Sequence, residues 1–152
     1  MIVKRPAVAA AAALVATSAL SGAAAVPGAA TEKGQTMHTK RLVVREVESQ
    51  SLGDRTFTGT DRIRSRWSGK VVGYDSYTGK FYQRQEKVVL DMANALKGGV
   101  IVTRVTIDDF ASNRFDGRIL KGTGKYAGIE GTLEGRTSND PDKMYVTLRY
   151  HL

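Results

Sequence analysis

Short runs rich in Val, Ile, Thr, Tyr and Phe dominate the chain after residue 41, and clusters of Gly, Asn, Asp and Ser separate them. No long segment shows the period of an amphipathic helix, so the runs are interpreted as strands. Eight strands are predicted, at residues 42–48, 57–67, 70–74, 80–91, 100–107, 118–121, 132–136 and 144–151.

Hydrophobic and polar residues alternate within these strands, which is typical of a sheet with one dry face. The last strand shows the alternation most clearly, with Met144, Val146, Leu148 and Tyr150 on one face. In the second strand, Phe57, Ile63 and Trp67 lie opposite a stripe formed by Arg62, Arg64 and Arg66. The stripe is typical of a solvated outer face and could also grip an anion.

Glycine-containing segments predict the connections between strands. Tyr77-Thr78-Gly79 and Lys97-Gly98-Gly99 are predicted to form tight turns, and residues 108–117 an exposed loop. Eight consecutively paired strands predict an all-β fold, an eight-stranded antiparallel closed β-barrel, because closure removes unpaired edges. A barrel of this size is filled by side chains or holds one small ligand.

The N-terminal segment has the three parts of a secretory signal peptide: a basic start at Lys4 and Arg5, an alanine-rich apolar middle and small residues at the end. Residues 1–30 are therefore predicted to be removed, with cleavage after Ala25 or Ala30. The middle is too short and too weakly apolar for a spanning helix. A secreted, extracellular protein without a stable membrane anchor is expected.

Composition narrows the class of protein further. Residues 31–40 are polar and without periodicity, which predicts a flexible lead-in before a single barrel domain at 41–152. Cysteine is absent, so thiolate chemistry and disulfides are excluded. The whole chain carries a formal charge of +8, and removal of residues 1–30 leaves 21 basic and 15 acidic residues, a charge of +6. Such a surplus suits either solubility or an anionic partner.

Common cofactor and metal motifs fail on spacing. The segment 122–128 contains Gly-Lys, but Ile119 occupies the position of the first phosphate-loop glycine and Tyr126 that of the magnesium-binding hydroxyl. His38 and His151 are the two histidines of the sequence, so a histidine-based zinc site is not expected. We expect no cofactor, no metal and no nucleic-acid partner.

Two glycine-rich stretches, Gly69-Lys70-Val71-Val72-Gly73-Tyr74-Asp75-Ser76 and Gly122-Thr123-Gly124-Lys125-Tyr126-Ala127-Gly128-Ile129-Glu130-Gly131, resemble signature stretches of the allene oxide cyclase and dirigent superfamily. Between them, Gly98-Gly99-Val100-Ile101-Val102 looks like the family's glycine turn entering a central strand. The resemblance implies an eight-stranded barrel with a central cavity, assembled as a homodimer or homotrimer. The glycines of the second stretch are interpreted as architectural, with Tyr126 filling the space beside them.

The resemblance also implies a cavity that binds a small hydrophobic ligand and folds it into a reactive shape without a cofactor. Candidate catalytic residues are Glu46, Glu48, Asp61 and Arg104, and candidate ligand-binding residues are Trp67, Tyr74 and Tyr126. Glu46 and Glu48 are placed on the inner face of the first strand. Arg104 is either a lumen cation that pairs with a carboxylate or a surface charge.

Three functions stay open at this point. The first is an allene oxide cyclase-like or dirigent-like protein that directs cyclisation or stereoselective coupling, which would make it a cofactor-independent isomerase or cyclase. The second is a lipocalin-like carrier without chemistry. The third is a basic extracellular protein that binds anionic polymers.

Overall fold

The computed structural model describes residues 36–108 and 110–152. The predicted signal peptide, residues 1–30, lies outside these residues, as does the start of the predicted lead-in. The described residues form eight strands and two short 3-10 helices: β1 (His38–Gly53), β2 (Thr56–Ser65), β3 (Val71–Tyr82), η1 (Gln83–Gln85), β4 (Lys87–Leu96), β5 (Gly99–Ile107), β6 (Arg114–Gly122), η2 (Gly124–Tyr126), β7 (Glu130–Thr137) and β8 (Lys143–His151).

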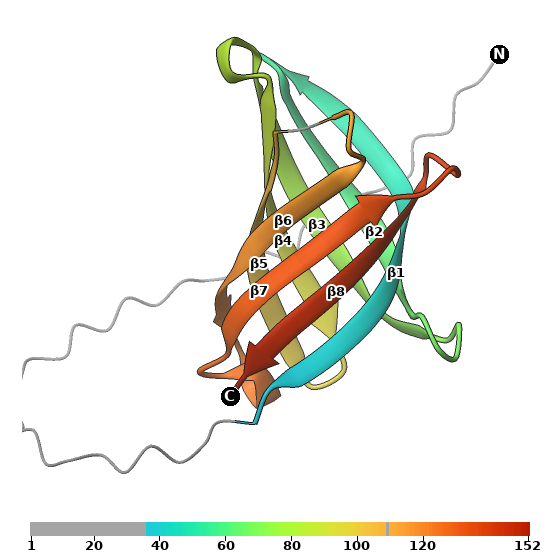
Figure 1. Ribbon diagram of the computed structural model, residues 1–152, viewed down its shortest axis with the longest axis vertical. Coiled ribbons are helices and arrows are strands. Elements are labelled where there is room, and N and C mark those ends of the chain that lie inside the picture. Colours follow the sequence, from blue (N-terminus) through green and yellow to red (C-terminus); the bar gives the residue numbers. More distant parts are fainter. Residues whose placement is uncertain (1–35, 109) are drawn as a thin grey trace, which may run out of the picture. The chain divides into compact units, whose positions relative to one another are not determined.

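The strands form a closed barrel in chain order, and every neighbouring pair is antiparallel. β1 pairs with β2 on one side and with β8 on the other, and the two ends of the sheet meet along that second pairing (Figure 1). The predicted all-β, eight-stranded antiparallel closed barrel is therefore confirmed. No helix in the described residues is long and apolar enough to cross a membrane.

Alternate residues of each strand point into the barrel and form its core. Fully buried members of this core include Ile63, Ile101 and Val105, from β2 and β5. The predicted face of β8 is confirmed, because Leu148 and Tyr150 are buried and pack in the same cluster. Burial of these side chains stabilises the fold by about 25 cal/mol for each Å² of apolar surface removed from water.

Aromatic rings fill space inside the barrel by lying across glycines of the neighbouring strand. A Cβ atom placed on Gly79 would come within 2.3 Å of the Phe57 ring, and one on Gly135 within 2.1 Å of the Phe115 ring. A methyl group at either position would collide with the ring. These glycines are therefore required by side-chain packing rather than by backbone conformation.

The predicted turn at Tyr77-Thr78-Gly79 is wrong. These residues lie inside β3, which runs unbroken from Val71 to Tyr82, and the actual reversal follows at η1. Gly79 accommodates the Phe57 ring and does not turn the chain. The real turn contains no glycine, because Glu86 itself adopts the left-handed conformation with φ of 46°. The predicted turn at residues 97–99 is confirmed, with Gly98 at φ of 97°.

The glycine-rich segment between β6 and β7 closes one end of the barrel. Tyr126 in η2 is 3% exposed and packs edge to face against Tyr150, with ring centroids 6.4 Å apart. A Cβ on Gly122 would lie 2.1 Å from the carbonyl oxygen of Tyr126, and Gly124 has a positive φ of 58°. The segment is architectural, as the sequence predicted.

The packing at Gly59 gives a test of the barrel interior. A Cβ at this position would lie 2.4 Å from the Tyr77 hydroxyl oxygen and 2.6 Å from the backbone carbonyl oxygen of Glu48. Gly59→Ala is expected to lower the free energy of unfolding by about 1–3 kcal/mol, because the backbone cannot yield to the new methyl group. Urea unfolding measures this change.

Thr60→Ala is the matched control, since Thr60 is the next residue of β2 and its side chain is exposed. It should change the free energy of unfolding by less than about 0.5 kcal/mol. A Gly59→Ala protein as stable as Thr60→Ala would show that the interior packing described above is incorrect.

Candidate functional site

Three carboxylates and a phenol from three adjacent strands meet at the inner wall of the barrel. Glu46 comes from β1, Asp61 from β2, and Asp75 and Tyr77 from β3. In the sheet register, Asp61 lies directly opposite Glu46 on one side and opposite Asp75 on the other. Side chains opposite one another on neighbouring strands have Cβ atoms about 4.5–5.5 Å apart. We call these four residues the acidic cluster.

Asp61 and Asp75 are buried without compensation. Their side chains are 1% and 3% exposed, and none of their carboxylate oxygens has a hydrogen-bond partner among the described residues. No Lys, Arg or His in the described part of the chain forms an ion pair with them. Placing charge in such an environment is costly, so the pair favours a protonated state.

The pKa values of both aspartates are shifted upward, in agreement with this burial. Desolvation, followed by the negative charge of Glu46, raises the pKa of Asp61 from 3.8 to about 6. Desolvation, followed by the charge of Asp61, raises the pKa of Asp75 from 3.8 to about 7. The pair therefore takes up its first proton as the pH falls through neutrality, and that proton can bond the facing carboxylate.

Glu46 and Tyr77, the other two members of the cluster, hydrogen-bond to each other. Glu46 is exposed, and one of its carboxylate oxygens accepts a hydrogen bond of 3.2 Å from the Tyr77 hydroxyl. The other accepts a hydrogen bond of 2.8 Å from the Ser49 hydroxyl. Burial and the nearby charges of Asp61 and Glu46 raise the pKa of Tyr77, so its hydroxyl stays protonated and acts as a donor.

An apolar cavity lies inside the barrel. Eleven of its thirteen lining residues are apolar, and the exceptions are Asn94 and Thr103. The Asn94 amide donates to the carbonyl oxygen of Ile101 at 3.0 Å and to the Thr103 hydroxyl at 3.2 Å. Asn94 is the register partner of Asp75, so the acidic cluster begins one strand away from the cavity, whose lining contains none of the four cluster residues.

The free space in this cavity is small, about 30 Å³. That volume holds one or two water molecules at most. A larger guest would have to displace lining side chains, and Met92 and Met144 are the ones best able to move because methionine has three flexible torsions.

The structure brings together two of the predicted catalytic residues, Glu46 and Asp61. It places Glu48 elsewhere: a β-bulge between Glu46 and Glu48 leaves Glu48 opposite Thr60, on the outer face. The expectation that both glutamates share the inner face with Leu42 and Val44 is therefore wrong. The extra residue of the bulge shifts the alternation by one position.

Arg104 lies outside the barrel, so it is a surface charge and not a cation of the lumen. Its guanidinium donates two hydrogen bonds to the carboxylate of Asp91, of 2.6 and 2.9 Å, across β4 and β5. This bond lowers the pKa of Asp91. Arg104 therefore does not reach the acidic cluster.

Two of the three predicted ligand-binding aromatics, Trp67 and Tyr126, line one pocket of about 290 Å³, and Tyr74 is not among its lining residues. Trp67 follows the end of β2 and is 80% exposed, and Tyr74 is 54% exposed on the outside of β3. The expectation that Trp67 belongs to the second strand, on the face of Ile63, is wrong, because the chain leaves the strand after Ser65. Tyr126 faces inward but seals the end of the barrel beside Tyr150.

Sequence reasoning missed Asp75 and Tyr77. Gly73, Asp75, Tyr77 and Gly79 are spaced two residues apart along β3 and so share one face of the strand. This period of two could have shown that the strand continues past Tyr74. The mistaken turn at residues 77–79 concealed it by ending the strand at Tyr74. No group of three or more His, Cys, Asp or Glu side chains in the described residues is arranged to hold a metal ion.

The buried pair predicts an unusual dependence of stability on pH. A carboxyl group whose pKa is raised by folding binds its proton more tightly in the folded state. Its stabilising contribution is complete below about pH 4 and is lost as the pH rises through about 6–7. Asp75→Asn should therefore be more stable than the parent protein at pH 8, by roughly 1–3 kcal/mol, and the gain should vanish near pH 4.

Denaturant unfolding at several pH values measures this difference. Asp91→Asn is the control, and its effect on stability should have the opposite sign. The ion pair with Arg104 lowers the pKa of the Asp91 carboxylate, so loss of this pair should slightly destabilise the protein at pH 8. A loss of stability in Asp75→Asn at pH 8 would mean that the carboxylate is satisfied in the folded protein.

Comparison with known proteins finds solved structures that superpose on this barrel. No protein-family model matches this sequence, and neither does any curated protein sequence. A pyocyanin demethylase superposes with a TM-score of 0.60 at 23% identity, over 74% of this chain and 99% of that chain. A pterocarpan synthase dirigent protein gives 0.64 at 12% identity, over 84% and 96% of the two chains.

An exo-specific intermolecular Diels-Alderase is also similar, with a TM-score of 0.63 at 12% identity over 78% of this chain and 98% of that chain. These TM-scores show a shared fold. Dirigent proteins and Diels-Alderases have the same eight-stranded barrel, which confirms the fold implied by the two glycine-rich stretches. The chain thus has the eight-stranded barrel fold that these dirigent proteins and Diels-Alderases share.

Proposed function

We propose that this chain is an exported, cofactor-independent enzyme that binds a small, largely apolar molecule in its barrel and directs its cyclisation, coupling or a related rearrangement. The acidic cluster exchanges a proton with the bound molecule. The observation that carries the proposal is the burial of Asp61 and Asp75, without a cation, one strand away from the polar lining residue Asn94 of an apolar cavity. Perturbed carboxyl groups of this kind are characteristic of catalytic sites.

The cluster indicates the chemical class of the substrate. Three carboxylates face the interior or its mouth, and no cation among the described residues balances Asp61 or Asp75. A substrate with a basic or cationic centre, or with N–H or O–H donors, would supply the missing partner. The apolar lining would hold the rest of the molecule and exclude water.

A carboxyl group with a pKa near neutrality can both donate and accept a proton at working pH. The protonated member of the pair would donate to the substrate, and the ionised member would stabilise positive charge that develops in the transition state. Glu46 is exposed and lies opposite Asp61 in the register, so it would return the proton from solvent after each turnover. The rigid barrel would hold the substrate in one reactive conformation.

The structural neighbours support a small-molecule substrate. Their names describe a demethylase of pyocyanin, a dirigent protein that acts as a pterocarpan synthase, and a Diels-Alderase. The shared barrel therefore accommodates several reactions on small organic molecules.

A carrier of the same shape is the second candidate, and the composition of the cavity wall favours it. Asn94 and Thr103 are its two polar lining residues, and they hydrogen-bond to each other rather than pointing free groups at a guest. A carrier would bind its ligand without converting it, so the two functions differ in turnover.

Pyocyanin and a panel of phenolic, heteroaromatic and polyene compounds provide the first test. Native mass spectrometry detects binding, and absorbance and product mass detect conversion. We expect one compound class to be converted, and Asp61→Asn and Asp75→Asn to lower turnover by about 100-fold or more with little change in binding. Asp91→Asn, on the outer face, should keep full turnover.

Two results would contradict the proposal. Full turnover in both Asp61→Asn and Asp75→Asn would remove the acidic cluster from the chemistry. Binding of a panel compound without any conversion by the parent protein would favour the carrier.

A further inference from the structure

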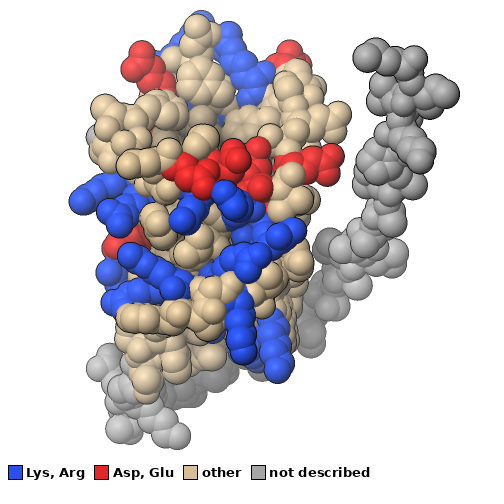
Figure 2. Space-filling model, turned by 90° about the vertical axis from the view of Figure 1, so that its right-hand side faces the viewer, with Lys and Arg blue, Asp and Glu red and all other residues tan. Residues whose placement is uncertain are grey.

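The outside of the barrel carries a second feature, independent of the cavity. Seven cations project from the outer face of β7, β8, β1 and β2 and from the turn that follows β2: Arg41, Arg45, Arg62, Arg64, Arg66, Arg136 and Lys143. We call this set the cationic face. In the register, Arg45 lies between Lys143 and Arg62. Figure 2, seen from the side where β1 lies in Figure 1, shows Lys and Arg side chains gathered below a band of acidic ones.

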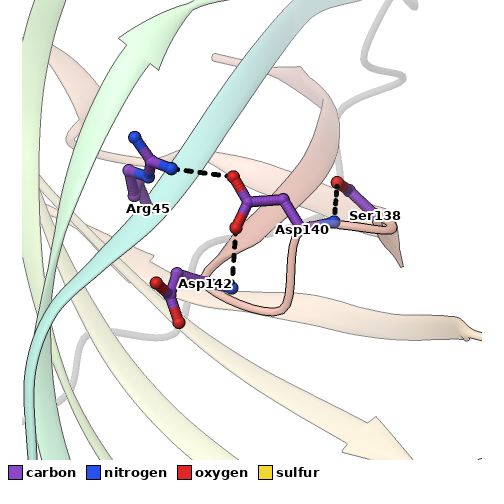
Figure 3. A network of polar contacts seen from close by, with 4 residues as sticks. All are labelled: Arg45, Ser138, Asp140 and Asp142. Atoms are coloured by element: carbon purple, nitrogen blue, oxygen red, sulfur yellow. Dashed lines mark hydrogen bonds and ion pairs between the residues drawn. The ribbon is translucent and has the colours of Figure 1, made fainter.

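One of these cations has an acidic partner. Arg45 forms an ion pair of 2.7 Å with Asp140, whose other carboxylate oxygen accepts a bond from the backbone N–H of Asp142 (Figure 3). The backbone N–H of Asp140 donates to the Ser138 hydroxyl, which completes this turn. None of the other six cations forms an ion pair with a carboxylate within residues 36–108 and 110–152. The positive charge of the face therefore remains largely unneutralised.

Aromatic rings hold several of these cations in place. Three cations surround the ring of Tyr145. The guanidinium of Arg66 lies 5.0 Å from the ring centroid, and the charged groups of Arg136 and Lys143 each lie 5.4 Å from it. The Arg41 guanidinium lies 5.7 Å from the centroid of the Trp67 ring. A cation–π contact restrains a side chain without cancelling its charge, so less conformational entropy is lost when an anion binds.

A groove of about 520 Å³ runs beside Tyr145 and gives this region a concave surface. Arg66, Arg114 and Arg136 line it together with three acids, Asp108, Asp116 and Glu134. Glu134 is paired with Arg149. An anion in the groove would therefore lie on the side of Arg66 and Arg136, against the Tyr145 ring.

We propose that the cationic face binds a linear anionic polysaccharide through its sulfate, phosphate or carboxylate groups. The cations spread over four adjacent strands, which are about 4.8 Å apart, so the face is wider than a single small anion. Six of the seven are arginines, whose planar guanidinium matches two oxygens of an oxyanion at once. Single-stranded nucleic acid fits less well, because cations already occupy the Tyr145 ring on which a base would stack.

Heparin affinity chromatography and binding titrations against heparin test the proposal. The parent protein should bind heparin at 150 mM NaCl and weaken steeply as salt rises, because binding releases counterions. Arg66→Gln combined with Arg136→Gln should lower heparin affinity by about 10-fold or more. Circular dichroism and a thermal melt should show that this variant is folded.

The matched control removes the same charge elsewhere. Arg104 and Arg118 lie opposite one another on the outer faces of β5 and β6, away from the groove, so Arg104→Gln combined with Arg118→Gln should lower heparin affinity by less than about 3-fold. An equal loss in both double variants would overturn the proposal, because it would indicate an effect of net charge alone. Tighter binding of a thymidine oligonucleotide, or of phosphatidylserine vesicles, at the same salt concentration would also overturn it.

Discussion

The hydrogen-bonded pairing of β1 with β8 is the constraint on which the rest of the structure depends. It joins Leu42 to Val146 and Val44 to Met144, and it converts an eight-stranded sheet into a barrel. Side chains alternate between the two faces of a strand, so closure turns one face into an enclosed interior. Asp61 and Asp75 are withdrawn from water for this reason, and their raised pKa values follow.

The same alternation gives the two faces of one strand opposite chemistry. Asp61 points into the barrel, and its neighbour Arg62 points outward into the cationic face. A shift of the register by one residue would exchange them, placing an arginine in the core. Burial of a carboxylate without a cation lowers stability, and the proposed catalytic role would account for its presence in the interior.

Much of this arrangement could be predicted from the sequence, and the failures have specific physical causes. Eight successive β-type runs were enough to predict the barrel, and the glycines of 122–131 were enough to predict an architectural segment beside Tyr126. Gly79 resembled a turn glycine although a ring from the neighbouring strand requires it, which hid Asp75 and Tyr77. The bulge that turns Glu48 outward leaves no sign in the composition, because a bulge depends on pairing with β2.

Direct titration of the buried pair is the most decisive measurement. The carboxyl carbons of Asp61 and Asp75 can be followed by ¹³C NMR between pH 3 and 9, with assignments from Asp61→Asn and Asp75→Asn. We predict that at least one of the two groups titrates near neutral pH, since desolvation and the facing charge raise both pKa values from 3.8. Titration of both groups near pH 3.8 would show that they are solvated or paired, and would contradict the proposed site.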